Sequence, residues 1–190
     1  MTKKLVFMMS VSLDGYFEGP GQDLSWHLIS EELHQHFNDE LRGLSAFIEG
    51  RVNYELMEGF WPTADADPEA PSPVSEFARI WRETPKIVVS RTLTQVGPNA
   101  TLMREVDPEE IRRMKSEPGG DLGVGGADLA ATFIAHDLVD EYRLYVHPVV
   151  IGEGRHLFPD GMHLDLTLVD SRAFANGVVL LRLSPAAEAS

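Results

Sequence analysis

The stretch Asp121-Leu122-Gly123-Val124-Gly125-Gly126-Ala127-Asp128-Leu129 predicts a short buried strand that runs directly into a helix. The apolar residues before the two adjacent glycines are typical of a buried strand. Gly125 and Gly126 carry no Cβ, so another backbone or a ligand can approach the joint closely. The helix predicted over residues 127–136 starts with free N–H groups, which attract anions. A bare strand-to-helix turn has the same pattern, so the remaining motifs decide between the two interpretations.

The bulk composition predicts a single globular α/β domain over residues 1–190. The chain has 190 residues, of which 43% are hydrophobic and 24% are charged, which is ordinary for a domain with a sizeable core. It contains no cysteine, which excludes disulfides and thiolate metal sites and favours a reducing compartment. No apolar run approaches the ~18 residues of a membrane span, and no cleavage pattern follows the first strand. We therefore expect a cytoplasmic protein without a membrane partner.

The formal net charge of -14 repels nucleic acid and anionic lipid, so we expect neither as a partner. An anionic cofactor would need a local cluster of Arg or Lys. His34 and His36 stand two residues apart in a predicted helix and point to different faces, so we expect no metal ion there.

Strand and helix patterns alternate along the chain. The predicted strands are residues 5–11, 46–48, 86–90, 101–104, 122–124 and 141–150, and the predicted helices are residues 31–43, 52–60, 74–81, 109–116 and 127–136. This alternation predicts a mostly parallel α/β sheet. Asn176-Gly177 predicts a type I′ hairpin between residues 167–173 and 178–183, so the sheet should end in an antiparallel pair.

Two helix starts carry capping signals. Ser30 is a good N-cap residue, and the two glutamates after it suit a first turn. Asp107 followed by Pro108 is typical of an N-cap with proline at the first helical position. Residues 18–23 and 62–73 are rich in glycine, proline and acidic residues, so we expect surface loops there.

Five short motifs then stand in a characteristic order. They are Val11-Ser12-Leu13-Asp14-Gly15, Gly50-Arg51-Val52-Asn53-Tyr54-Glu55, Val88-Val89-Ser90-Arg91-Thr92, Gly125-Gly126-Ala127 and His156-Leu157-Phe158-Pro159-Asp160. In order and spacing the chain resembles the dihydrofolate-reductase-like superfamily. It is most similar to the branch that includes the C-terminal reductase domain of the riboflavin-biosynthesis deaminase-reductase. Each motif alone is common, but five in sequence over nearly the whole chain are specific.

The resemblance implies a dihydrofolate-reductase-like three-layer fold, with a mostly parallel central sheet and a C-terminal antiparallel hairpin. It also implies NADPH as cofactor, a homodimer, and a cis peptide bond between Gly125 and Gly126. The residues it places at the cofactor are Ser12, Gly50, Arg51, Asn53, Ser90, Arg91, Gly125, Gly126, Ala127, Asp128 and Leu129.

Two of these positions suit the 2′-phosphate that distinguishes NADPH from NADH. Arg51 opens a helix, and Ser90 and Arg91 end the neighbouring strand, so all three should lie at one carboxyl edge of the sheet. Arginine offers a forked donor for phosphate. Any single arginine is more often solvated surface charge, but two at successive strand ends of an acidic protein favour the cofactor interpretation. Asn53 stands where the family often has threonine.

On the substrate side, dihydrofolate reductases use a carboxylate on the first helix. The resemblance makes Glu32 and Glu31 the catalytic candidates, with Asp14 of the first motif as a third. Trp26 lies six residues before Glu32, at the spacing of some members, and is a substrate-binding candidate. Both glutamates equally suit a helix first turn, where they would stabilise the helix dipole.

Arg42 matches a position that can bind the ribose phosphate of the riboflavin-pathway substrate. Its alternative role is a cation at a helix end, interacting with the dipole. Thr84 and Val146 depart from the folate-binding pattern, and the segment after Gly50 lacks the Asp-Asp-Pro pattern of the riboflavin reductase.

The sequence therefore predicts an NADPH-dependent reductase acting on a small heterocyclic molecule, resembling 5-amino-6-(5-phosphoribosylamino)uracil reductase. Two alternatives stay open: a dihydrofolate or other pterin reductase, and an NADP-binding module without turnover. The binding module is considered because the chain departs from the substrate-binding patterns of both kinds of reductase.

Overall fold

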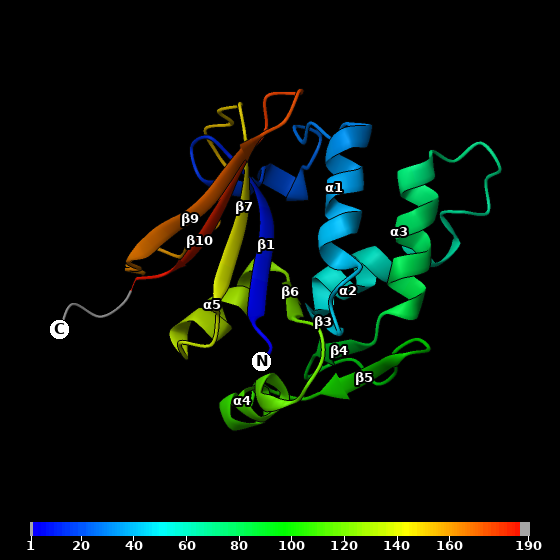
Figure 1. The fold of residues 1–190 in the computed structure, drawn as a ribbon, viewed down its shortest axis with the longest axis vertical. Coiled ribbons are helices and arrows are strands. Elements are labelled where there is room, and N and C mark those ends of the chain that lie inside the picture. The colour runs from blue at the N-terminus through cyan, green and yellow to red at the C-terminus, as the bar shows by residue number, and fades with distance from the viewer. Residues whose placement is uncertain (1, 187–190) are drawn as a thin grey trace.

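A computed structural model describes residues 2–186, which form an eight-stranded sheet flanked by helices (Figure 1). The strands of this sheet are β1 (Leu5–Ser12), β3 (Ala46–Gly50), β4 (Lys86–Val89), β5 (Ala100–Met103), β6 (Leu122–Gly125), β7 (Glu141–His147), β9 (Leu166–Ala173) and β10 (Val179–Pro185). The helices are α1 (Glu31–Leu41), α2 (Arg51–Glu58), α3 (Ser72–Glu83), α4 (Pro108–Ser116) and α5 (Ala127–Ala135), with 3-10 turns η1 (Pro20–Gln22) and η2 (Trp61–Thr63). The strand order is β5-β4-β3-β6-β1-β7-β10-β9.

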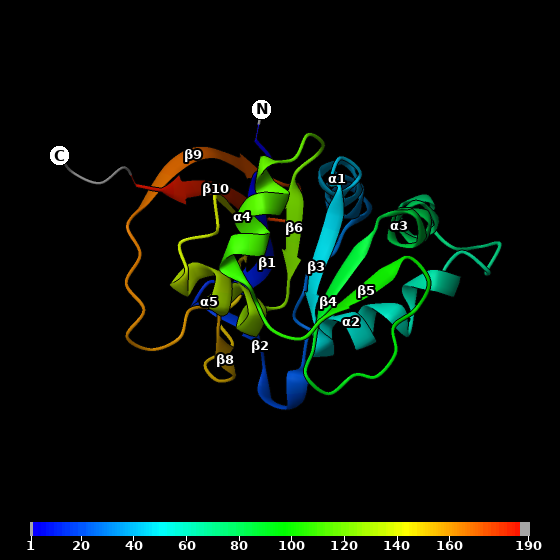
Figure 2. The same ribbon diagram turned by 90° about the horizontal axis from the view of Figure 1, so that it is seen from below.

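The six strands from β5 to β7 are parallel, while β10 runs antiparallel to both β7 and β9. The predicted mostly parallel sheet with an antiparallel C-terminal pair is thereby confirmed. Helices α1, α2 and α3 cover one face of the sheet, and α4 and α5 cover the other (Figures 1 and 2). The molecule therefore has three layers.

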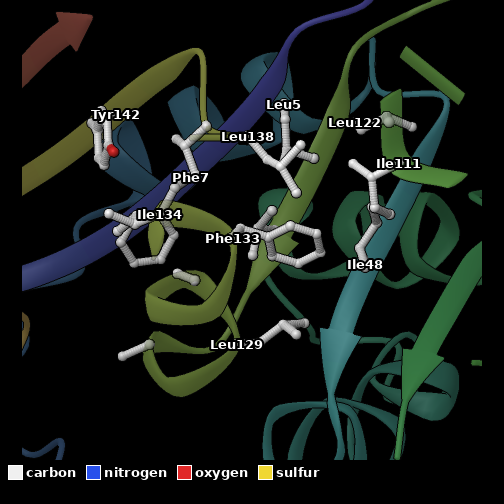
Figure 3. Packing of buried hydrophobic residues seen from close by; sticks show 14 of the residues in the cluster. Leu5, Phe7, Ile48, Ile111, Leu122, Leu129, Phe133, Ile134, Leu138 and Tyr142 are labelled. Atoms are coloured by element: carbon white, nitrogen blue, oxygen red, sulfur yellow. The ribbon is translucent and has the colours of Figure 1, made fainter. Parts of the chain in front are cut away.

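Each face of the sheet has its own core, because side chains alternate along a strand. Phe7 packs with Phe133 and Ile134 of α5 in the larger cluster, as Figure 3 shows. On the other face, Phe47 and Trp81 belong to the cluster that holds α2 and α3. Burial on both faces explains why the first five residues of β1, Leu5 to Met9, are all apolar.

The predicted N-caps of α1 and α4 are confirmed. The Ser30 hydroxyl accepts a hydrogen bond from the Leu33 N–H, and the Asp107 carboxylate accepts from the N–H groups of Glu109 and Glu110. These side chains satisfy N–H groups that a helix start otherwise leaves free.

Three local predictions are wrong. β7 ends at His147 rather than near residue 150, because Pro148 has no N–H to continue the ladder. The β9–β10 connection is not type I′, since Asn176 lacks the positive φ that this turn requires. Phe174 and Val178 instead close a three-residue loop with Gly177 at φ 87°, the usual geometry of a type I turn with a bulge.

The third miss is a small second sheet. β2 (Tyr16–Glu18) pairs antiparallel with β8 (Arg155–His156), in segments where the sequence indicated only loop. Such short strands leave almost no periodicity to detect. Among residues 2–186, no helix is both long and apolar enough to cross a membrane.

Candidate functional site

The carboxyl ends of β3 and β6 meet at a cleft of about 620 Å³. These strands are neighbours in the sheet, with Glu49 opposite Gly125, and each leads directly into a helix. α2 begins after Gly50 and α5 begins after Gly126, and the first turns of both helices line the cleft. Two helix starts therefore point into one space.

Neither of these helix starts is capped by a side chain. This contrasts with α1 and α4, whose first N–H groups are bonded to Ser30 and Asp107. Glycine at both N-caps of the cleft leaves the N–H groups of the first turns free for a ligand. Together with the helix dipoles, they make a site for an anion.

Gly126 adopts φ 96°, which an L-residue with a side chain rarely tolerates. A Cβ at this position would lie 3.5 Å from the Cβ of Asn53 on α2, within the cleft. All peptide bonds among the described residues are trans, so the expected cis bond between Gly125 and Gly126 is wrong. The positive φ at Gly126 turns the chain instead, and the cofactor assignment loses the support of that bond.

Gly125 has a different role from Gly126. A Cβ built on Gly125 would fall on the carboxylate of Glu49, a residue that is 5% exposed. Glu49 lines a second, smaller hollow of about 90 Å³ with apolar walls, on the α1–α3 side of the sheet. The space opened by Gly125 is therefore filled by a carboxyl group of the chain itself.

The positive charges of the cleft are Arg51 and Arg155. Arg51 on α2 is 47% exposed and pairs with Glu55 one turn along, with 2.8 Å between Nη1 and Oε2. Arg155 on β8 pairs with Glu18 at 3.0 Å and also binds Asp128 in the first turn of α5. In a chain of net charge -14, two arginines thus balance the two carboxylates that line the cleft.

Seven of the eleven predicted cofactor residues line the cleft. They are Gly50, Arg51, Asn53, Gly126, Ala127, Asp128 and Leu129. Gly125 lies at the adjoining apolar hollow, and Ser12, Ser90 and Arg91 do not line the cleft.

The residues of the β4 end lie beside the cleft rather than in it. Gly50 is opposite Val89, so Arg51 and Ser90 follow at the same level of the carboxyl edge. The Ser90 hydroxyl accepts from the N–H groups of Thr92 and Leu93 and thereby closes a turn, while Arg91 is exposed.

Ser12 and Asp14 hold a loop together. The Ser12 hydroxyl donates to Asp14 at 2.6 Å, and the Asp14 carboxylate accepts from the N–H groups of Ile151 and Gly152. The Ser12 hydroxyl is the main cause of a lowered pKa at Asp14. An acid with a lowered pKa that already carries these bonds is poorly placed to donate a proton.

The predicted substrate residues are not brought together. Glu32 binds Arg172 of β9 and the N–H of Ala175, so it ties α1 to the C-terminal hairpin. Glu31 is exposed in the same turn. Both thus occupy the helix-start positions of the structural alternative, because the inward face of α1 is taken by residues such as Leu33.

Trp26 and Arg42 do not line the cleft either. The Trp26 ring packs edge-on against His27 and His147, with centroid separations of 4.2 and 5.4 Å. Arg42 follows the last turn of α1 and binds Glu76 of α3. It therefore joins two helices in addition to its place near the negative end of a helix dipole.

The model of the RibD C-terminal domain family matches residues 3–180. The chain belongs to the RibD C-terminal domain family. Among known proteins, this RibD C-terminal domain is similar to the uncharacterized protein YyaP of Bacillus subtilis (strain 168). The two are 33% identical over 179 residues, which cover 93% of this chain and 92% of YyaP.

Solved structures show the fold. A putative riboflavin biosynthesis protein from Shewanella sp. PV-4 has a TM-score of 0.74 at 18% identity, covering 98% of this chain and 100% of that one. Dihydrofolate reductase from Enterococcus faecalis, complexed with NADP(H), has a TM-score of 0.64 at 12% identity, covering 97% of this chain and 99% of that one. The predicted dihydrofolate-reductase-like fold is confirmed.

A third structure is bifunctional. The diaminohydroxyphosphoribosylaminopyrimidine deaminase/5-amino-6-(5-phosphoribosylamino)uracil reductase of Thermotoga maritima has a TM-score of 0.64 at 15% identity. The match covers 97% of the RibD C-terminal domain described here and 57% of that longer chain.

Sequence reasoning missed two functional candidates in this RibD C-terminal domain. Arg155 stands directly before the fifth motif, and its basic side chain was the available signal. Glu49 interrupts the apolar strand Ala46-Phe47-Ile48 immediately before Gly50. A charged residue inside a buried strand is rarely neutral to function or stability, and this was the signal for Glu49.

Proposed function

We propose that the chain is an NADPH-dependent reductase of the type of 5-amino-6-(5-phosphoribosylamino)uracil reductase. The observation that carries the proposal is the pair of uncapped helix starts, α2 and α5, which face one cleft of about 620 Å³. A dinucleotide cofactor has a diphosphate at its centre, and helix N-termini are its usual protein partners.

The chain's own groups fit this cofactor. The free N–H groups of the α2 and α5 first turns would bind the diphosphate. Arg51 would turn from Glu55 to the 2′-phosphate, because both partners are half exposed and their pairing is weak. Asp128 would repel a diphosphate, and Arg155 offsets that charge by binding it. When bound, the cofactor supplies hydride to the substrate.

The choice of substrate class rests on family membership. Two structural relatives are a deaminase/5-amino-6-(5-phosphoribosylamino)uracil reductase and a dihydrofolate reductase. A ribosylaminopyrimidine and a pterin are both planar heterocycles that would have to reach the border of the cleft and the apolar hollow. We place the ribosylaminopyrimidine first, since the family match spans residues 3–180.

The test combines binding with turnover. NADPH fluorescence measures binding, and NADPH absorbance is then followed with a ribosylaminopyrimidine phosphate, dihydrofolate, other pterins and small carbonyls. Oxidation that depends on the ribosylaminopyrimidine supports the proposal, and oxidation with dihydrofolate alone favours the pterin alternative. Tight NADPH binding without oxidation by any acceptor favours a binding module. Failure to bind NADPH at all contradicts the proposal.

We also propose a homodimer, for which the outer strand of the sheet is the candidate surface. β9 is the last strand in the order, and it exposes Leu168 and Val169 on an unpaired edge. Light scattering after size exclusion should give twice the chain mass at micromolar concentration. A monomer there contradicts the dimer, and Val169→Lys should convert a dimer to monomer.

A further inference from the structure

Glu49 is a buried carboxyl group at the border of the cofactor cleft. It precedes Gly50, the N-cap of α2, and stands opposite Gly125 in the sheet. Its side chain points to the α1–α3 side and lines the apolar hollow of about 90 Å³. The hollow and the cleft are adjacent, because Gly125 lines the first and Gly126 lines the second.

The carboxyl group is held from one side only. Asn53, whose side chain lines the cleft, donates a hydrogen bond from Nδ2 to Glu49 Oε2. Within residues 2–186, Oε1 has no hydrogen-bond partner. The absent Cβ of Gly125 provides the room for this carboxyl group. Oε2 of Glu49 is bonded to Asn53, and Oε1 is left available to a ligand.

The surroundings of Glu49 favour its protonated form. Burial raises the pKa of Glu49 to about 7, and the hydrogen bond from Asn53 and the charge of Lys86 oppose that rise. Lys86 on β4 acts from a distance, because its ammonium donates to the carbonyl oxygens of Trp81 and Thr84. The neighbours from the other elements are uncharged: Val6 and Met8 of β1, Leu41 of α1, Met57 of α2, Phe77 of α3 and Val124 of β6.

The other acids near the site are occupied or misplaced. Glu18 and Asp128 line the cleft but are both paired with Arg155. Glu32 is bound to Arg172 of β9, and Asp14 is bound within its loop. Of these four carboxyl groups, none lines the apolar hollow.

We propose that Glu49 is the proton donor of this reductase site, a role that rests on the proposed function. Reduction of a C=N or C=O bond adds a hydride, from a reduced nicotinamide dinucleotide, to the carbon. The Oε1–H bond of Glu49 breaks and its proton passes to the nitrogen or oxygen, which completes the reduction. Glu49 is left as a carboxylate, stabilised by the Asn53 amide, and regains a proton from solvent through the cleft.

The first experiment measures the protonation of Glu49 directly and needs no turnover. Carbon-13 NMR of protein labelled at glutamate Cδ, recorded from pH 4 to 9, should show one carboxyl resonance that titrates near pH 7. Glu49→Gln should remove that resonance, and Glu83→Gln, at an exposed position at the end of α3, should leave it. A wild-type protein in which every glutamate titrates below pH 6 contradicts the proposal, whether or not the variant folds.

The second experiment separates this proposal from the proposed function. With an acceptor that supports NADPH oxidation, Glu49→Gln should lower kcat at least tenfold and remove the alkaline decline of kcat near pH 7. Its Kd for NADPH should stay within threefold of wild type, and Glu49→Asp should recover part of kcat. Equal kcat and pH profile in Glu49→Gln overturns the role of Glu49 and leaves the reductase intact. Absence of NADPH binding in wild type overturns the proposed function instead.

Discussion

The carboxyl edge of β3 and β6 and the region around the start of α1 are built in different ways. At the edge, the cleft is made mainly by backbone: two glycine N-caps, two free helix starts and a positive φ at Gly126. Around α1, side chains contact one another, as in the Glu32–Arg172 ion pair and the stacked rings of His27 and His147. The first region leaves backbone donors free for a ligand, whereas the second packs its side chains against one another.

The largest expected effect is on NADPH binding, after a substitution at the backbone joint of the cleft. Gly126→Val should weaken NADPH binding by more than a hundredfold, because a β-branched residue does not tolerate φ 96° and its side chain would occupy space in the cleft beside Asn53. Circular dichroism should show that the domain still folds. Gly43→Ala is the matched control, since that position is open and unstrained. Unchanged fluorescence titration of Gly126→Val would remove this joint from the site.

A second prediction concerns stability on the α1 side. His147 is fully buried, its Nδ1 accepts from the Leu28 N–H, and burial, with a smaller effect of His27, lowers its pKa to about 4. As the pH falls below 6.5, His147 therefore binds a proton in the unfolded chain but stays neutral in the folded chain until the pH approaches 4. The contribution of neutral His147 is complete above pH 6.5 and is lost as the pH falls to 4, at about 1.4 kcal/mol per pKa unit.

Urea unfolding between pH 7 and pH 4 measures this loss. His147→Asn keeps an acceptor for Leu28 but cannot take up the proton, so its free energy of unfolding should fall less steeply below pH 6.5. NADPH binding at pH 7 should be the same in both proteins. An identical pH slope would show that His147 does not cause the acid sensitivity.

The third prediction compares two arginines at successive strand ends. Arg51→Ala should weaken NADPH binding about tenfold to a hundredfold, because a hydrogen bond to a charged group contributes roughly 1.5–3 kcal/mol. NADH has no 2′-phosphate and should hardly respond. Arg91→Ala should change either affinity less than threefold, since Arg91 does not line the cleft.

Isothermal titration at two salt concentrations makes this comparison. The NADPH preference of wild type should decrease as salt rises, because the Arg51 side chain is 47% exposed. Equal weakening of both cofactors in Arg51→Ala would mean that the residue acts on structure rather than on the 2′-phosphate.

The smallest effect is expected at Glu32. Glu32→Gln should lower the free energy of unfolding by at most about 1 kcal/mol, because its pair with Arg172 is nearly half exposed. NADPH oxidation by the best acceptor should be unchanged. A tenfold loss of kcat in this variant would return Glu32 to the active site.

Much of the fold was readable because it depends on periodicity and punctuation. The alternation of strand and helix patterns predicted a mostly parallel sheet, and Ser30 and Asp107 predicted two caps that the structure has. The errors in the end of β7 and in the β9–β10 turn arise where a single residue departs from the local sequence pattern. Pro148 stops β7 early, and the φ of Asn176 selects a different turn.

In the candidate site, too, backbone positions were easier to predict than side-chain contacts. The family resemblance placed Gly50 and Gly126 together at the cofactor, and both follow parallel strands that end at one carboxyl edge. The direction of a side chain depends on partners from distant parts of the chain. Glu32 turns toward Arg172, 140 residues away, and Glu49 turns under Gly125, and neither partner follows from local sequence.

The central claim is that NADPH binds between the starts of α2 and α5. Amide NMR during an NADPH titration tests it most directly, because each helix start reports by itself. The largest shifts are expected at Val52 and Asn53 of α2 and at Asp128 and Leu129 of α5, with little change at the Asp107-capped start of α4. Saturable shifts confined to other amides, or no shifts at millimolar NADPH, would contradict the account.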